Sequence, residues 1–173
     1  MFNIAILGCG VVGSGVADIL FDKQESLSKR FNQEVKLSKI LDIKNMDGTP
    51  YAPYLVTEPA DVFEDDSIKL VVVTIGGLDL AADRCFAALN AGKHVVTSNK
   101  AVVAAYGREL TKLAYEKNVR FLYACGSFPH CRRNIFRARS NRLLHFNGHS
   151  AVPFAFRGNV CSLPFHNAFR RFR

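Results

Sequence analysis

The segment NIAILGCGVVGSGVADIL, residues 3–20, contains the clearest indication of the fold. Its first five residues form an apolar run, which predicts a buried strand. Residues 11–30 then have helical spacing, with four apolar side chains on one side of the predicted helix, Val12, Val16, Ile19 and Leu20. Between strand and helix, GCGVVG matches G-x-G-x-x-G in the strand–turn–helix setting that a dinucleotide-binding loop requires. The segment therefore predicts the first strand and helix of a nucleotide-binding α/β domain.

Each glycine of this loop has its own expected task. Gly8 permits the tight turn, Gly10 lets the backbone approach a pyrophosphate, and Gly13 lets helix and strand pack closely. The phosphates would then lie on free N–H groups at the positive end of the helix dipole. The alternative is a glycine-rich turn that binds nothing.

The rest of residues 1–123 alternates between strands and helices. Further strands are predicted at residues 35–41, 68–74, 94–97 and 119–123, further helices at 78–91 and 101–117, and a loop at 42–54. This alternation is typical of βαβ units with right-handed connections. We therefore expect an α/β fold, a Rossmann-like doubly wound parallel sheet.

Asp42 ends the second predicted strand, 34 residues after Gly8. A carboxylate there accepts hydrogen bonds from both ribose hydroxyls and repels a 2′-phosphate. The nearby cations are Lys39 and Lys44, and no arginine stands beside Asp42. We therefore expect NAD to bind at least as well as NADP, unless Asp42 is merely a solvated residue at the end of a strand.

Thr74, Gly76 and Gly77 follow the third predicted strand at its carboxyl end, where ligands bind in open α/β sheets. Two glycines at this position allow the close approach of the nicotinamide half of a dinucleotide. The alternative is a turn without a ligand.

The segment TSNKAVVAAYG, residues 97–107, places a lysine where helix stability does not explain it. Asn99 is a good N-cap for the next helix. Lys100 then stands in the first helical turn, where a cation costs about 0.3–1 kcal/mol against the helix dipole. A buried or half-buried lysine at this edge of the sheet is suited to binding a substrate carboxylate or moving a proton, and the alternative is a plain surface lysine.

Four segments together resemble the NAD(P)-binding domain of homoserine dehydrogenase, over about residues 2–123. They are IAILGCGVVGSGVADIL, VVVTIGGLDLA, ALNAGKHVVTSNKAVVA and NVRFLY, and GKHVVTSNKA is the most discriminating part. The resemblance implies the reversible oxidation of L-homoserine to L-aspartate 4-semialdehyde with NAD or NADP, a step in threonine and methionine biosynthesis.

The resemblance also implies roles for individual residues. The pyrophosphate is held by Gly8, Gly10, Val11, Val12 and Gly13. The nicotinamide and substrate side is lined by Gly76, Ser98, Asn99 and Lys100, with Lys100 the candidate catalytic residue. The family usually reads VVVETIGG where this chain reads VVVTIGG, one residue shorter, and the difference bears on the cofactor contacts of Thr74.

Residues 124–173 differ in composition from the rest. They hold nine arginines, no lysine and no acid, a net charge of +9, whereas residues 1–123 have a net charge of −1. After FLY the family continues into E-A-x-V-G-G-G-I-P with a monovalent-cation site, then a second domain with the catalytic Asp and Lys, the substrate pocket and the dimer interface. Here ACGSFPHC follows. We therefore predict two parts: a dinucleotide-binding domain at 1–123 and an irregular basic, poorly ordered tail at 124–173.

Three interpretations of the tail stand open. A divergent catalytic domain would lack the acid that the chemistry uses. A zinc-binding or nucleic-acid-binding module would use Cys125, Cys131, His145 and His149, whose spacing is near that of a zinc finger. We favour the third, a shifted reading frame after about residue 123. On that interpretation the chain binds a dinucleotide without turning over homoserine, and nucleic acid is not its partner.

The compartment follows from weaker signals. The apolar N-terminus lacks the basic start of a signal peptide, and no stretch approaches the roughly 20 apolar residues of a membrane span. Five cysteines, an odd number, give no disulfide framework. We expect a cytoplasmic protein without a membrane partner, with no metal site.

Overall fold

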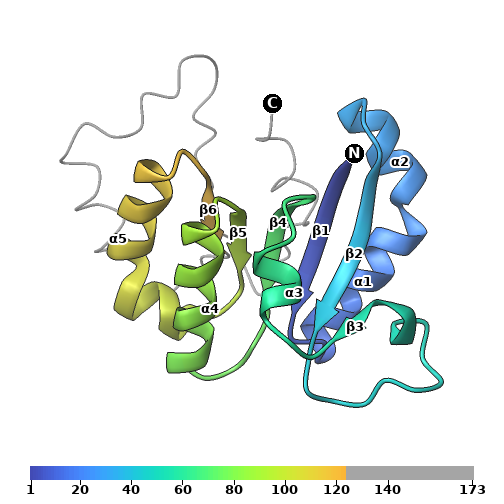
Figure 1. The fold of residues 1–173 in the computed structure, drawn as a ribbon, viewed down its shortest axis with the longest axis horizontal. Coiled ribbons are helices and arrows are strands. Elements are labelled where there is room, and N and C mark those ends of the chain that lie inside the picture. Colours follow the sequence, from blue (N-terminus) through green and yellow to red (C-terminus); the bar gives the residue numbers. More distant parts are fainter. Residues whose placement is uncertain (124–173) are drawn as a thin grey trace, which may run out of the picture. The chain divides into compact units, whose positions relative to one another are not determined.

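The computed structural model describes residues 1–123, and residues 124–173 lie outside the described part (Figure 1). Six parallel strands form one sheet in the order β3-β2-β1-β4-β5-β6. Their bounds are β1 Phe2–Leu7, β2 Val35–Leu41, β3 Leu55–Val56, β4 Ile68–Val73, β5 His94–Thr97 and β6 Phe121–Tyr123. The chain therefore reverses its direction across the sheet between β1 and β4, whose carboxyl ends lie side by side.

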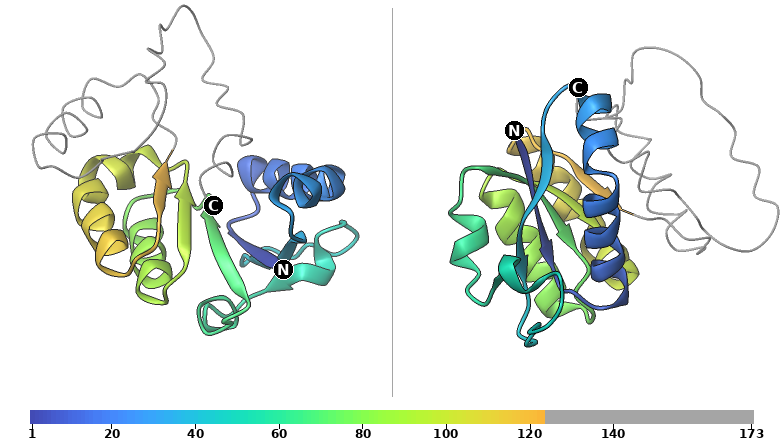
Figure 2. Two further views of the ribbon diagram at one scale, coloured as in Figure 1. Left: turned by 90° about the horizontal axis from the view of Figure 1, so that it is seen from above. Right: turned by 90° about the vertical axis from the view of Figure 1, so that its right-hand side faces the viewer.

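Helices cover both faces of this sheet. They are α1 Val11–Asp22, α2 Gln24–Phe31, α3 Ala60–Phe63, α4 Asp79–Asn90 and α5 Lys100–Glu116, with a 3₁₀ turn, η1, at Ala52–Tyr54. α1 and α2 lie on one face, and α3, α4 and α5 on the other (Figures 1 and 2). Right-handed crossovers that run outward from β1 in opposite directions require this division. The expected Rossmann-like doubly wound fold is confirmed.

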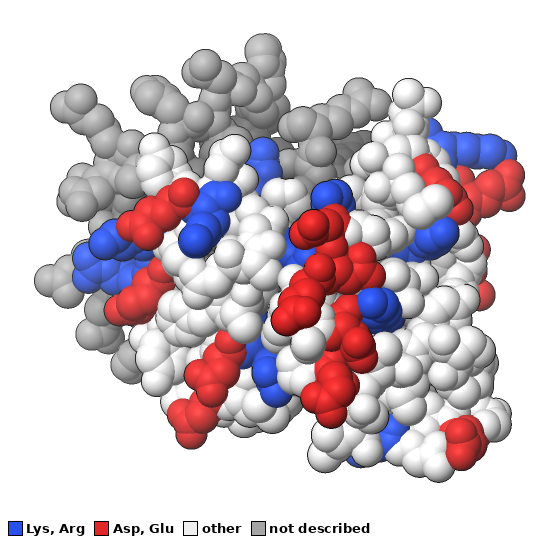
Figure 3. Space-filling view, in the orientation of Figure 1, with Lys and Arg blue, Asp and Glu red and all other residues white. Residues whose placement is uncertain are grey.

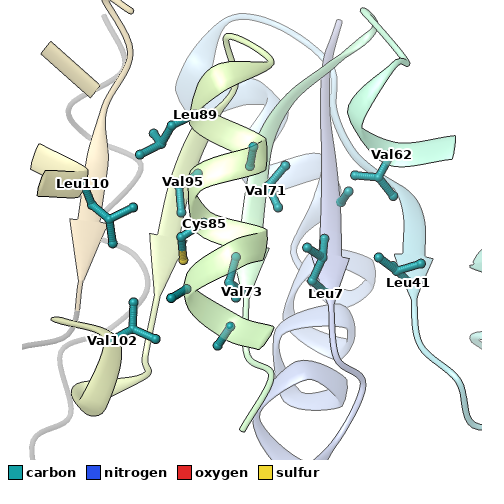
Figure 4. Packing of buried hydrophobic residues seen from close by; sticks show 14 of the residues in the cluster. Leu7, Leu41, Val62, Val71, Val73, Cys85, Leu89, Val95, Val102 and Leu110 are labelled. Atoms are coloured by element: carbon teal, nitrogen blue, oxygen red, sulfur yellow. The ribbon is translucent and has the colours of Figure 1, made fainter. Parts of the chain in front are cut away.

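The central strands β1 and β4 are apolar except at Asn3 and Lys69, because both of their faces are covered. In β1, Ala5 and Leu7 pack into the cluster beneath α4, where Cys85 of α4 meets Val73 and Val95 of the neighbouring strands (Figure 4). The alternate side chains of β1, Ile4 and Ile6, point to the opposite face and are also fully buried. The carboxyl ends of these strands are thereby fixed as a rigid edge.

The single helix predicted over residues 11–30 is wrong, because the chain breaks at Lys23, which caps both α1 and α2. The buried face of α1 also differs from the predicted one. Val12 and Ile19 are 49% and 45% exposed, whereas Gly13, Val16, Ala17 and Leu20 face the sheet. Because Gly13 packs closely against the glycine loop, the face of α1 that carries Gly13 is turned toward the sheet, and Val12 lies on the solvent side.

Residues 42–54, predicted as a loop, include η1, and the strand and helix that follow were not predicted. β3 has two residues, which pair with Ile40 and Leu41, and α3 has four. Both are too short to show a period of 2 or 3.6 in the sequence. Within residues 1–123, no helix has the length and hydrophobicity needed to cross a bilayer.

The face seen in Figure 3 carries charges of both signs. Acidic side chains gather over α3, with lysines and arginines on either side of them. One pair in this region joins Lys39 of β2 to Asp65, with 2.9 Å between Nζ and Oδ2. A continuous basic stripe, the usual footprint of a nucleic-acid site, is absent from this face of the described residues.

Candidate functional site

The glycine loop joins β1 to α1 at the point where the sheet order reverses. Gly8 has a φ of +92°, in the region that favours glycine, as the expected tight turn requires. A Cβ added at Gly8 would lie 3.0 Å from both the backbone N and the Cγ1 of Ile75. The turn after β1 therefore packs directly against the turn after β4, which places both at the crevice where open α/β sheets bind ligands.

Gly13 is the point of closest contact between α1 and this loop. An added Cβ would lie 2.0 Å from the carbonyl oxygen of Gly8 and 3.0 Å from Oγ1 of Thr74. The Thr74 hydroxyl itself contacts the carbonyl oxygens of Gly8 at 2.5 Å and Leu7 at 3.1 Å. The close packing predicted for Gly13 is confirmed, and Thr74 is placed on the underside of the loop.

The first turn of α1 offers backbone N–H groups to a ligand. Gly10 is the N-cap and has no side chain with which to cap the helix, and a Cβ added there would meet nothing within 4 Å. Among residues 1–123, no group accepts a hydrogen bond from the backbone N–H of Val11 or Val12, and the Val11 side chain is 93% exposed. This is the arrangement in which a helix N-terminus binds an anion.

Asp42, at the end of β2, reaches the glycine loop. Its Oδ2 accepts a hydrogen bond from the backbone N–H of Cys9 at 2.6 Å, and its Oδ1 accepts one from the N–H of Lys44 at 3.0 Å. Two bonds leave lone pairs on both oxygens for further donors. Burial raises the pKa of the Cys9 thiol, and the charges of Asp42 and Asp18 raise it further.

The segment after Asp42 is fastened to α1. The Tyr51 hydroxyl donates to Oδ1 of Asp18 at 2.6 Å, which raises the pKa of Tyr51 to about 12, and its ring stacks on Phe21. Ile43 directly follows Asp42 and is 95% exposed. Ile43 was not among the residues predicted from the sequence, although an isoleucine next to a carboxylate at the end of a strand, in an otherwise polar loop, was a usable signal.

At the other side of the site, Asn99 joins two turns. Its Oδ1 accepts from the N–H groups of Ala101 and Val102 at 3.0 and 3.2 Å, which confirms the predicted N-cap. Its Nδ2 donates to the carbonyl oxygens of Ile75 at 3.1 Å and Gly77 at 2.5 Å. The turn after β4 and the N-terminus of α5 are therefore held together by one side chain.

Lys100 is the first residue of α5, which confirms its expected place in the first helical turn, but its side chain is exposed rather than buried or half-buried. Ser98 is half-buried beside it. Gly76 and Gly77 stand in open space across the turn, and Gly77 has a φ of +80°. The predicted site residues thus lie on four turns along one edge of the sheet. Among residues 1–123, no group of three His, Cys, Asp or Glu side chains is placed to hold a metal.

Comparison with known proteins identifies similar sequences. The family model described as homoserine dehydrogenase, NAD binding domain, matches residues 8–124. The chain is 34% identical over 119 residues to a homoserine dehydrogenase of Neisseria gonorrhoeae, which covers 68% of this chain and 27% of that protein. It is 40% identical over 134 residues to a homoserine dehydrogenase of Corynebacterium glutamicum, and the match covers 73% of this chain and 30% of that protein. The chain thus spans less than a third of the length of these two relatives.

Solved structures agree with the sequence comparison. A homoserine dehydrogenase of Staphylococcus aureus superposes with a TM-score of 0.65 at 30% identity, over 70% of this chain and 32% of that one. A homoserine dehydrogenase of Thiobacillus denitrificans superposes with a TM-score of 0.63 at 35% identity, over 71% of this chain and 29% of that one.

Proposed function

Since the chain belongs to the homoserine dehydrogenase family, we propose that residues 1–123 bind NAD or NADP along the carboxyl edge of the sheet. Residues 1–123 form one compact unit, which supports a boundary for the binding domain at Tyr123. The observation that carries the proposal is the open N-terminus of α1 beside a fixed carboxylate. The N–H groups of Val11 and Val12 would receive the pyrophosphate, and Asp42 the ribose hydroxyls.

The remaining contacts follow from position along the edge. The adenine would lie toward Ile43, whose exposed side chain offers an apolar surface next to the ribose-binding carboxylate. The nicotinamide would lie toward Gly76 and Gly77, where no Cβ blocks its approach. Thr74 would act indirectly, because its hydroxyl donates a hydrogen bond to the Gly8 carbonyl oxygen and so would stabilise the conformation of the loop.

Homoserine is the proposed second ligand of this site, which we expect to bind it without turnover, and Lys100 is the group that would meet it. In a family member that turns homoserine over, NAD or NADP held at this edge would supply the hydride acceptor, and a protein group would be needed as the base for the hydroxyl proton. Lys100 is exposed at the nicotinamide side and is suited to hold the substrate carboxylate or to take part in that proton transfer. We also infer a cytoplasmic location, since free thiols at Cys9 and Cys85 suit a reducing compartment.

The test of the cofactor site is a pair of glycine variants. Gly10 has an ordinary φ of −77°, and a Cβ there meets nothing, so Gly10→Ala should fold normally while its methyl group occupies the space of the pyrophosphate. We expect its affinity for NADH, followed by fluorescence titration, to fall by about tenfold or more, about 1.4 kcal/mol per tenfold. The matched control is Gly15→Ala in α1, which also meets nothing. Equal binding by Gly10→Ala, or no binding by the wild type, would contradict the proposal.

A second experiment addresses the substrate. Homoserine should raise the thermal midpoint of the NAD-bound protein, because a ligand that binds only the folded state stabilises it. Lys100→Ala should remove this rise when NAD is saturating. Lys112→Ala, an exposed lysine of the same helix that pairs with Glu116, is the control. A homoserine effect that survives in Lys100→Ala would exclude that residue from the substrate site.

A further inference from the structure

We propose that Asn99 is a positioning residue, which shapes the nicotinamide side of the site by latching the turn at residues 75–77 to the N-terminus of α5. Its side-chain amide bonds to two carbonyl oxygens of that turn and to two N–H groups of the helix. The inference rests on the proposed dinucleotide site and assigns Asn99 an indirect part in it.

The amide of Asn99 has no hydrogen-bonding position left for a ligand. A primary amide carries two N–H donors and an oxygen with two lone pairs. Both donors are used by Ile75 and Gly77, and both lone pairs by Ala101 and Val102. Such a side chain acts on a cofactor through the backbone that it holds.

The turn at residues 75–77 depends on such a hold. It contains consecutive glycines, Gly76 and Gly77, which have the greatest conformational freedom in the unfolded chain, and a Cβ at either would contact nothing. Ile75 at its start packs on Gly8 of the phosphate loop. The turn is therefore fixed at one end by the phosphate loop and at the other by Asn99.

Asn99 is itself fixed by the buried sheet. Its backbone N–H donates to Oγ1 of Thr97 at 3.1 Å, and that hydroxyl donates to the carbonyl of Val73 at 3.0 Å. Thr97 is 1% exposed. The latch is thus supported by β4 and β5, and the adjoining Lys100 begins α5 from the same fixed point.

Asparagine is needed because the latch requires donors and the helix cap requires an acceptor. Asp caps helices as well as Asn does. Asn99→Asp should therefore keep the cap, yet it would direct a carboxylate at the carbonyl oxygens of Ile75 and Gly77. Asn99→Ser also retains a capping oxygen and removes the donors of the latch without adding charge.

The first test compares NADH with ADP-ribose, which lacks the nicotinamide, on the full chain. In Asn99→Asp we expect the Kd for NADH to rise about tenfold or more, while the Kd for ADP-ribose stays within about twofold. Asn99→Ser should show the same selective loss. The matched control is Asn118→Asp, the same change just beyond the other end of α5, where Asn118 has a φ of +54°. It should change neither affinity.

The second test needs no ligand. Nitrogen-15 relaxation should show order parameters of Gly76 and Gly77 near the rigid value of about 0.85 in the wild type, falling toward about 0.6 in both Asn99 variants. Ala101 and Val102 should stay rigid in Asn99→Asp because the cap remains. The proposed role of Asn99 is contradicted if the order parameters of Gly76 and Gly77 are unchanged in the variants, or if the affinities for NADH and ADP-ribose fall equally. A wild type with a rigid turn that binds neither ligand would instead contradict the proposed function.

Discussion

The carboxylate of Asp42 accepts a hydrogen bond from the backbone N–H of Cys9, with 2.6 Å between Oδ2 and N. The end of β2 is thereby tied to the middle of the glycine loop, 33 residues earlier in the chain. One acidic side chain both anchors the loop and sets the charge beside the proposed ribose site, so its replacement should alter cofactor preference.

The wild type should bind NADH at least as tightly as NADPH. A 2′-phosphate would be repelled by the negative charge of Asp42, and Lys39 already forms an ion pair with Asp65. Asp42→Asn keeps an oxygen for the Cys9 N–H but removes the charge. We expect it to shift the ratio of the two Kd values toward NADPH by about tenfold, in line with about 1–4 kcal/mol for a charge pair at 4 Å. Asp47→Asn is the charge-matched control, and a wild type that clearly prefers NADPH would refute the assignment of Asp42.

Gly13→Ala should lower the free energy of unfolding by about 3 kcal/mol or more, because its Cβ would lie 2.0 Å from a backbone oxygen of Gly8 that cannot move freely. Gly15→Ala, two residues further along α1, should raise it by about 0.5–1 kcal/mol, since alanine restricts the unfolded chain at no steric cost. Urea denaturation compares the two. Similar stabilities would mean that Gly13 is not a point of close packing.

Asp18→Asn should lower the pKa of Tyr51 from about 12 toward its ordinary value of 10, since the hydrogen bond from Tyr51 to Asp18 is the main cause of the shift. A pKa raised by folding means that this contact contributes its full stability below pH 10 and loses it as the pH rises toward 12. Phenolate absorbance measured against pH should show the change, and Tyr51→Phe should lack the late phase. A late phase that persists in Tyr51→Phe belongs to another tyrosine.

Lys93→Met should destabilise the fold by about 1–3 kcal/mol, the usual cost of leaving buried acceptors unpaired. Lys93 is 2% exposed and donates to the carbonyl oxygens of Asp65 and Ile68 at 2.7 and 3.3 Å. Lys69→Met, which removes an exposed bond to the Asp66 carbonyl, is the control and should cost little.

The pH dependence gives a second measurement on Lys93. Burial lowers its pKa from 10.5 in the folded state, so the unfolded state binds more protons between the lowered value and 10.5. The stability of the wild type relative to Lys93→Met should therefore increase with pH across that interval. A difference independent of pH would show that burial does not shift this lysine.

Much of the fold could be predicted because its signals are local. The apolar runs at 3–7 and 35–41 match strands, the glycine spacing at 8–13 matches the turn into α1, and Asn99 was recognisable as a cap. β3 and α3 were missed because two and four residues carry no readable period. The spacing of apolar residues predicted one helix up to residue 30, but the chain breaks at Lys23, between α1 and α2.

The alternation of strands and helices follows from local sequence patterns, and it fixes the edge of the sheet where the glycine loop, Asp42 and Lys100 lie. Which atoms meet there depends on how the whole chain folds: Asp42 bonds to the Cys9 amide, and Asn99 bonds to the carbonyls of Ile75 and Gly77. A local pattern records how a segment turns and which face it buries, but each of these contacts joins segments at least 22 residues apart in the chain. Such partners are chosen when the sheet aligns the ends of its strands, because short polar side chains bond to whichever backbone groups that alignment brings within about 3 Å.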